Sequence, residues 1–400
     1  RGSFAEGSAR SANRGVDTRG LPDKTLVRDT CTRLVLGRYD PLATFSVTLE
    51  MVDLLDDDEE ERESHAFVQC IVRSVWNNVQ TVRVYTRRLA VAHDVHDYLD
   101  GIDEEITPLL LAREAVLRSL VGRDNNVSVT VTPENDQDLA ILAKKDLDAT
   151  IHQISKRYRL LGLENAGSTL NTRSSLDFAF PPELADALHS LYHLRRGPLL
   201  NPRLTNADDR AVLRDLFLRL PLRDAAAMMA PRVWNVNERG GEQLEEPIPV
   251  PPETLVLWSR SVLACDTFDQ SYVWVGQTVA SSNTSPPPPA VAMAERFIHS
   301  ITHYRFPAPQ IHIFSENSSM SRRFTCRLAP THNDPPEQQL AHFPALATLS
   351  LEEMGQLRAK WTGTRGGGFV MEESFREWFW KVVSASSKAG SEGVSLGELT

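Results

Sequence analysis

The stretch VQTVRVYTRRLAVAHDVHDYLDGIDEEITPLLLAREAVLRSLV, residues 79–121, changes its hydrophobic period along its length. In its first part Val82 and Val84 share one face and Arg83 takes the other, the period of two that is typical of a half-buried antiparallel strand. After Asp103 apolar residues recur every three or four positions, as in an amphipathic helix. The stretch therefore predicts a border between a β-rich region and a helical one.

The β-rich region extends upstream of this border. Phe67–Val75 predicts a strand that pairs with Val79–Arg88 through a turn at Trp76-Asn77-Asn78, and Phe45–Val52 predicts an earlier strand. The acidic run Asp56–Glu61 could be read as a cation site or as a solvated loop. The loop is favoured, because a calcium loop needs spaced ligands and a turn glycine.

The helical region continues to about residue 235, with one helix opening at Pro181 and another capped by Asn206. The proline-rich segment that follows predicts a linker. Beyond it the pattern mixes both types: we expect strands at Leu255–Trp258, Ser271–Val275, Gln310–Phe314 and Arg323–Leu328, and helices at Ala290–His303 and Glu372–Val383.

Composition narrows the class of protein. The 400 residues carry 43 Lys and Arg against 53 Asp and Glu, a net charge of −10, and 41% are hydrophobic, which fits a folded globular chain of two or three domains and disfavours wholesale nucleic-acid binding. The 4 cysteines form no C-x-x-C pair, which favours a reducing compartment. The chain starts at Arg1 without a signal peptide, so we expect a fragment.

Motifs for intrinsic catalysis are missing from the sequence. Neither a P-loop, a G-x-G-x-x-G run nor a G-x-S-x-G turn occurs, so nucleotide binding and serine hydrolysis have no warrant. His189 with His193, and His299 with His303, have the i, i+4 spacing of metal ligands, but no third ligand completes either pair. Surface or interface histidines are the favoured interpretation.

Arginine is the residue type that stands out. Arg195 and Arg196 end a predicted helix, while Arg322, Arg323 and Arg327 lie close together near the C-terminus. Guanidinium matches phosphate geometry well, yet most such clusters are solvated faces or partners of nearby carboxylates. By residue type alone, the second interpretation is favoured.

Several runs resemble, in order, the C-terminal portion of the Sec twenty-three (SEC23) family, the inner-coat subunit of COPII vesicles. They are the strand pair Phe67–Arg88, the apolar-Ala-Arg helix Leu109–Arg113, His193–Arg196, Asp266–Phe268, Arg305–Pro309 and Phe324. The resemblance implies an α+β multidomain fold, with a flexible lead-in at 1–28, a β-sandwich portion at 29–100, a helical domain at 101–235, a linker at 236–252, a gelsolin-like domain at 253–390 and a tail at 391–400.

The resemblance also implies a function without intrinsic catalysis. A SEC23-like chain would act in transport from the endoplasmic reticulum to the Golgi, would bind a Sar GTPase in its GTP form, a Sec twenty-four (SEC24) subunit and the outer coat, and would touch the membrane from the cytoplasm. The arginine that stimulates Sar falls on Arg323, oriented by Phe324. Arg195 and Arg196 would form an exposed basic face. No cofactor is implied here, since the family's zinc finger would lie upstream.

Two features keep other functions open. Ser318 and Ser319 stand where the family has a Gly-Gly pair, and Arg322 replaces a small residue, which is compatible with a non-catalytic scaffold or SEC24-like cargo adaptor. Tyr272–Gly276 resembles a gelsolin repeat, which suggests an actin binder as a further alternative.

Overall fold

The computed structural model describes residues 65–92, 95–121, 136–165, 180–181, 184–236, 247–281, 289–305, 308–362 and 373–384. The predicted strand Phe45–Val52, the acidic run Asp56–Glu61, the lead-in and the tail all lie outside these residues. The described part has helices and sheets in one chain, so the predicted α+β class is confirmed.

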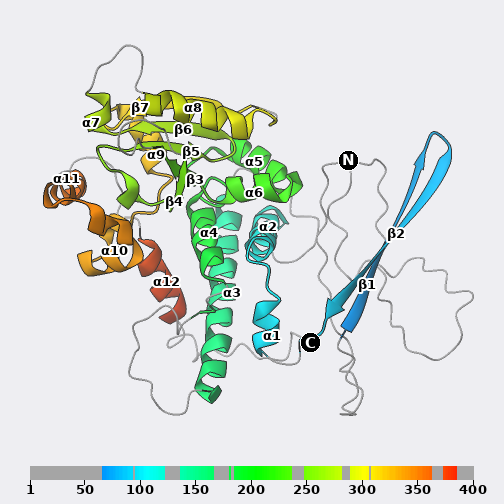
Figure 1. The fold of residues 1–400 in the computed structure, drawn as a ribbon. Coiled ribbons are helices and arrows are strands. Elements are labelled where there is room, and N and C mark those ends of the chain that lie inside the picture. Colours follow the sequence, from blue (N-terminus) through cyan, green and yellow to red (C-terminus); the bar gives the residue numbers. More distant parts are fainter. Residues whose placement is uncertain are drawn as a thin grey trace, which may run out of the picture.

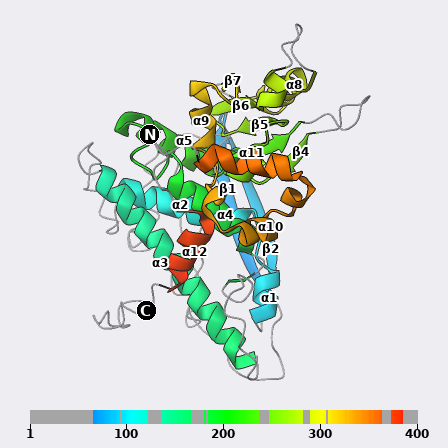
Figure 2. The same ribbon diagram turned by 90° about the vertical axis from the view of Figure 1, so that its left-hand side faces the viewer.

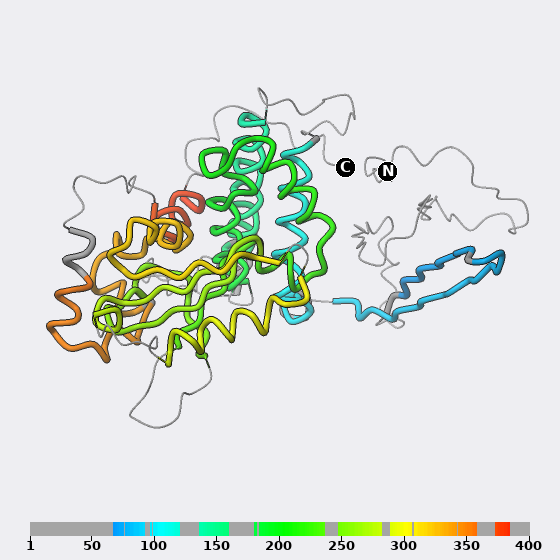
Figure 3. The backbone as a smooth tube through the Cα atoms, turned by 90° about the horizontal axis from the view of Figure 1, so that it is seen from above, coloured from blue at the N-terminus to red at the C-terminus, as the bar shows by residue number. Residues whose placement is uncertain are grey.

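The first described element is an antiparallel hairpin of β1 (His65–Trp76) and β2 (Val79–Ala90). Asn77 and Asn78 close it with φ of 48° and 60°, the left-handed conformation that a two-residue hairpin turn requires and that asparagine tolerates. The predicted hairpin is confirmed. The prediction that one face of its second strand is buried was wrong, because every residue of β2 is exposed. The hairpin projects from the rest of the described chain (Figures 1 and 3), and no second sheet covers it there.

Helices form the middle of the molecule. They are α1 (Val95–Asp100), α2 (Ile106–Val121), α3 (Asp136–Asn165), α4 (Ala185–Arg196), α5 (Ala207–Arg219) and α6 (Leu222–Met229). Asn206 caps α5 as predicted, accepting a hydrogen bond of 2.8 Å from the Asp209 amide. The last described helix, α12 (Phe375–Ser384), returns to pack beside α3 (Figure 2), and Phe375, Trp378 and Phe379 are buried in the helical core.

A five-stranded sheet follows the helices. Its order is β4 (Ile248–Val250), β3 (Arg232–Asn235), β5 (Val262–Asp266), β6 (Gln270–Val275) and β7 (Gln310–Ser315). Only the β6–β7 pair is parallel, and α8 (Pro289–Thr302) makes the crossover between these strands.

Both faces of the sheet are covered, which is why every residue of β5 is buried. Helix α8 packs on one face through Val291, Ala294 and Ile298. The other face packs against α9 (Arg322–Thr325), the 3-10 helix η6 (Pro344–Thr348) and α11 (Leu351–Thr362), which contribute Phe324, Leu346 and Leu357 to its core. Helix α10 (Pro336–His342) precedes η6.

Three local predictions in this region were wrong. Thr254–Val256 is a 3-10 helix, η3, which overlaps the start of the predicted strand Leu255–Trp258, because a short apolar run has no period that separates strand from helix. The predicted strand Arg323–Leu328 begins in helix α9 and continues as a turn, with Phe324 in the helix and Leu328 after it both buried. The strand β4 lies within the predicted linker, at the edge of the sheet, where a proline such as Pro249 is tolerated.

A buried charge network joins the helices to the sheet. Asp266, at the end of β5, receives two hydrogen bonds of 2.7 and 2.9 Å from Arg305 and one of 2.6 Å from Arg232. Arg305 also reaches Asp224 of α6 at 3.4 Å. Phe268, held at a φ of 70° by a bond from its amide to Asp266, inserts into the helical core. Burial alone would raise the pKa of Asp266, but the hydrogen bonds from Arg305 and the charge of Arg232 lower it.

A second buried carboxylate, Asp136, fixes the start of α3 against α5. It accepts hydrogen bonds from Arg210 at 2.8 Å and from Arg214 at 2.5 Å. Burial alone would raise the pKa of Asp136, but the bonds and charges of these two arginines outweigh it and lower the pKa. The folded chain therefore holds this carboxylate ionised more strongly than the unfolded chain does.

The lowered pKa of Asp136 predicts that the folded chain loses stability at acidic pH. The unfolded carboxyl, with a pKa of about 3.9, binds its proton before the folded one as the pH falls, so the stabilisation is complete above about pH 5 and is lost through pH 4 and below. We expect the free energy of unfolding, from urea titrations at pH 7 and pH 3.5, to drop more for the wild type than for Asp136→Asn. Asp215→Asn, in an exposed pair with Arg219, is the matched control. Equal drops in wild type and Asp136→Asn would contradict the assignment.

Candidate functional site

Arg323 lies on a short segment that leaves the end of β7. After Ser315 the chain turns through η4 (Ser319–Ser321) and enters α9. The Ser318 hydroxyl accepts a hydrogen bond of 3.2 Å from the Met320 amide and so caps η4. The serines that replace the expected glycine pair are therefore part of an ordered turn.

Phe324 anchors this segment in the domain. Its side chain is fully buried, with its ring centroid 6.1 Å from that of Tyr272. The predicted burial of Phe324 is found, although a helical turn produces it in place of the alternation of a strand. Arg322 and Arg323 precede it and are both exposed, so the helix directs the two guanidinium groups to solvent.

The arginines near α9 fall into two kinds. No hydrogen bond or ion pair joins the guanidinium of Arg322 or Arg323 to any of the residues that the structure describes. Arg327, by contrast, lies 3.9 Å from Asp269. Burial alone would lower the pKa of Arg327, but Asp269 and Tyr272 outweigh it and raise the pKa, so this cation is fixed. Two exposed positive charges thus lie near a third that is paired with a carboxylate.

Arg195 and Arg196 do not form the predicted exposed basic face. Arg195 makes two contacts of 2.9 Å with Asp148 and lies 5.2 Å from the centroid of the Trp378 ring. Arg196 donates a hydrogen bond of 2.8 Å to the carbonyl of Leu328, and so ties α4 to the segment after α9. Both side chains are only partly exposed, because each has a partner that is distant in sequence.

The Arg195 contact leads to a stability prediction. Burial raises the pKa of Asp148 and the charge of Arg195 partly offsets this, so removing the arginine leaves a half-buried carboxylate without its cation. We expect Arg195→Ala to lower the free energy of unfolding by about 1–3 kcal/mol in urea denaturation. Arg203→Ala, at an exposed position, is the control. Equal midpoints for the two variants would show that the Asp148 contact contributes nothing.

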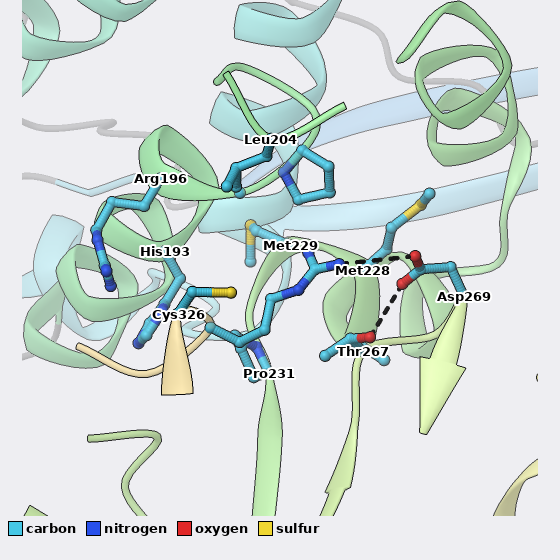
Figure 4. Close-up of a pocket in the computed structure, with 13 residues that line it drawn as sticks. His193, Arg196, Leu204, Met228, Met229, Pro231, Thr267, Asp269 and Cys326 are labelled. Atoms are coloured by element: carbon cyan, nitrogen blue, oxygen red, sulfur yellow. Dashed lines mark hydrogen bonds and ion pairs between the residues drawn. The ribbon is translucent and has the colours of Figure 1, made fainter. Parts of the chain in front are cut away.

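A pocket lies where the helices meet the sheet (Figure 4). It is lined by residues of α4, α6 and the turns around β5 and α9, among them His193, Met229, Asp269, Cys326 and Arg327. Burial, and secondarily the charge of Arg196, lower the pKa of His193 well below its usual value, so its imidazole is neutral. The pocket therefore lies between the helices and the sheet, and the histidine that lines it is uncharged.

Packing explains the histidine pair of α4, whereas His299 and His303 are exposed on and beside α8. His189 stacks on Phe375 with centroids 3.8 Å apart, and His193 is buried. Within the described residues no group of three or more His, Cys, Asp or Glu side chains could hold a metal ion. Among these same residues no helix is both long enough and apolar enough to cross a bilayer.

The sequence did not predict the buried charge network that joins the helices to the sheet. Asp266 and Arg305 were each noted within a motif, yet nothing in the sequence indicated that they pair with each other. A buried arginine shortly after a helix and an aspartate at a strand end were the available signals. Their pairing follows from the β6–α8–β7 crossover, which brings Arg305 back to the end of β5.

Comparison with known proteins finds similarity both in sequence and in fold. The chain is 27% identical over 365 residues, 91% of its length, to the protein transport protein SEC23 A of Arabidopsis thaliana, of which it spans 37%. The human COPII-coat protein Sec24c matches 73% of the chain, and 37% of its own length, with a TM-score of 0.52 and 16% identity, which shows the fold. No family profile matches the chain.

A weaker structural overlap involves a protein from the Thorarchaeota 2DGel3/rabbit actin complex. It covers 24% of this chain and 44% of that one, with a TM-score of 0.20 and 21% identity, and it carries no argument about fold or actin. The chain is therefore similar in sequence to a SEC23 protein and similar in fold to a SEC24 protein of the COPII coat.

Proposed function

We propose that this SEC23/SEC24-like chain is a COPII coat subunit that stimulates GTP hydrolysis by a Sar-type small GTPase. In this proposal it acts from the cytoplasm at the endoplasmic reticulum membrane, together with a SEC24-like subunit and the outer coat. Because the chain spans 37% of SEC23 A, the activity and the partners of the whole relative are proposals for this chain.

One observation carries the proposal: Arg323 is an exposed guanidinium, free of described partners, on a turn that Phe324 anchors in the core. Phosphoryl transfer is accelerated mainly by neutralising charge on the oxygens of the transferred group, and an arginine supplied by a partner does this without a base or pocket of its own. A short, anchored helix limits the number of orientations that the arginine must lose on docking.

The binding step has a direct test. Sar locked in its GTP form, immobilised on beads, should retain the chain, whereas Sar loaded with GDP should retain much less. The reason is that the γ-phosphate orders the switch segments of a small GTPase, so the surface that a partner recognises is present only in the GTP form. Equal retention by both forms, or by neither, would contradict the proposal.

A non-catalytic scaffold of the same architecture is the second candidate. It is favoured by the ordered turn at Ser318, which holds the segment in place of the flexible glycines expected there, and by the second arginine, Arg322, beside the first. A scaffold would bind its coat partners without changing the rate of GTP hydrolysis.

A further inference from the structure

The segment that carries Arg323 is held at both of its ends. Phe324 is fully buried at its far end. At its near end Glu316 continues the parallel ladder, with its amide donating a hydrogen bond of 2.8 Å to the carbonyl of Val275. Between these points Asn317, Arg322 and Arg323 are exposed. The direction of the arginine therefore depends on how firmly each end is held.

The near end is fastened to a different part of the chain, the short helix α7 (Gln277–Ala280). The Gln277 amide donates a hydrogen bond of 2.8 Å to the Glu316 carboxylate. The Gln277 side-chain oxygen accepts one of 2.7 Å from the Asn317 side-chain amide. The Gln277 side-chain nitrogen lies 3.3 Å from the Ser281 hydroxyl, which orients the amide group. Gln277 thus forms hydrogen bonds through its backbone amide and through both the oxygen and the nitrogen of its side-chain amide.

Gln277 itself is held rigidly against the sheet. The preceding Gly276 lies so close to Ser259 that a Cβ at this position would be 2.2 Å from the Ser259 carbonyl oxygen. Its amide donates a hydrogen bond of 2.8 Å to Ser261. Only glycine permits this close approach, so the start of α7 has a fixed place at the end of β6.

We propose that the Gln277–Asn317 side-chain pair is a positioning pair for Arg323, fixing the near end of its segment as Phe324 fixes the far end. This inference rests on the proposed function. Neither residue touches the GTPase site in the proposal. They act by reducing the number of orientations in which the arginine-bearing segment meets the partner.

Solvent exposure separates this role from a purely structural one. Gln277 and Asn317 are both exposed, and the pair joins a four-residue helix to a turn, so it buries little apolar surface. Loss of the pair is expected to leave the core of the sheet domain intact. Its effect falls on the six residues between Asn317 and Phe324, which include both free arginines.

The test uses the rate of single-turnover GTP hydrolysis by Sar as a function of the concentration of the chain. We expect Asn317→Ala and Gln277→Ala to lower the rate at saturation about threefold to tenfold, the size of one lost hydrogen bond, with the half-saturating concentration unchanged. The double variant Gln277→Asn with Asn317→Gln keeps the amide pair and its total length, and should recover most of the rate. Gln310→Ala, an exposed glutamine on β7, is the control.

Hydrogen exchange gives a second measurement that does not depend on Sar. The amides of residues 318–323 should exchange faster in Asn317→Ala than in the wild type, while those of β6 should not change. If the wild type stimulates Sar and Arg323→Ala does not, but Asn317→Ala equals the wild type in rate, the positioning role is overturned and the proposed function stands. A wild type without stimulation overturns both.

Discussion

Arg323→Ala is expected to remove most of the stimulation of GTP hydrolysis while leaving the fold intact. An arginine supplied in trans accelerates hydrolysis roughly 10³-fold to 10⁵-fold, so its loss raises the barrier by about 4 kcal/mol or more. The side chain is exposed and makes no hydrogen bond or ion pair with the described residues, so the variant should unfold at the same urea concentration as the wild type.

Binding of Sar provides the control for this variant. Because the arginine acts mainly on charge that develops in the transition state, retention by GTP-locked Sar should change little. A variant that loses binding and stimulation together would assign Arg323 to the docking surface. A variant that keeps the full rate would exclude it as the activating group.

Arg305→Met is expected to have the largest effect on stability. Arg305 is 6% exposed and donates to both oxygens of Asp266, which is fully buried. Methionine fills much of the volume of the arginine side chain. Among the described residues, the Asp266 carboxylate then keeps only Arg232 as a cationic partner. Breaking a buried pair by removing one partner costs about 3–5 kcal/mol, so we expect a loss of this size in the free energy of unfolding.

Two further variants distinguish the buried pair from a general effect of arginine. Arg219→Met removes an exposed pair with Asp215 and should cost less than about 1 kcal/mol. Asp266→Asn combined with Arg305→Met should be less harmful than the sum of the single changes, because the unpaired charge is gone. A loss below about 1 kcal/mol for Arg305→Met would show that the network does not stabilise the packing of the helices against the sheet.

The elements that the sequence predicted correctly have a strong local signal. The change of period at Asp103, the Asn77-Asn78 turn and the cap at Asn206 all depend on neighbours within a few residues. The assignment failed where the signal was short. Thr254–Val256 and Arg322–Thr325 are single turns, and three or four residues do not define a hydrophobic period.

The partners of the charged residues could not be predicted for a different reason. Arg195 was expected on an exposed face, but Asp148 and Trp378, its partners, are far away along the chain. Residue type shows that a charge exists and tertiary packing decides what neutralises it. Arg323 differs because its exposure follows from Phe324, its immediate neighbour, whose burial the sequence did indicate.

The pairing of Gln277 with Asn317 could not be predicted from the sequence for the same reason, because it too depends on tertiary packing. The two residues are 40 positions apart and meet because the parallel β6–β7 pair places the ends of both strands at one edge of the sheet. Nothing in the sequence indicated that these two residues pair. Their relation to Arg323 emerges only from the topology.

The central claim, that this chain supplies an activating arginine to a Sar-type GTPase, is tested most directly by single-turnover GTP hydrolysis with four proteins. They are the wild type, Arg322→Ala, Arg323→Ala and the double variant. The account predicts full or nearly full stimulation by the wild type and Arg322→Ala, and at least a roughly 10³-fold lower rate with Arg323→Ala and the double variant. Equal rates with all four proteins would contradict it and would leave the scaffold as the function of this chain.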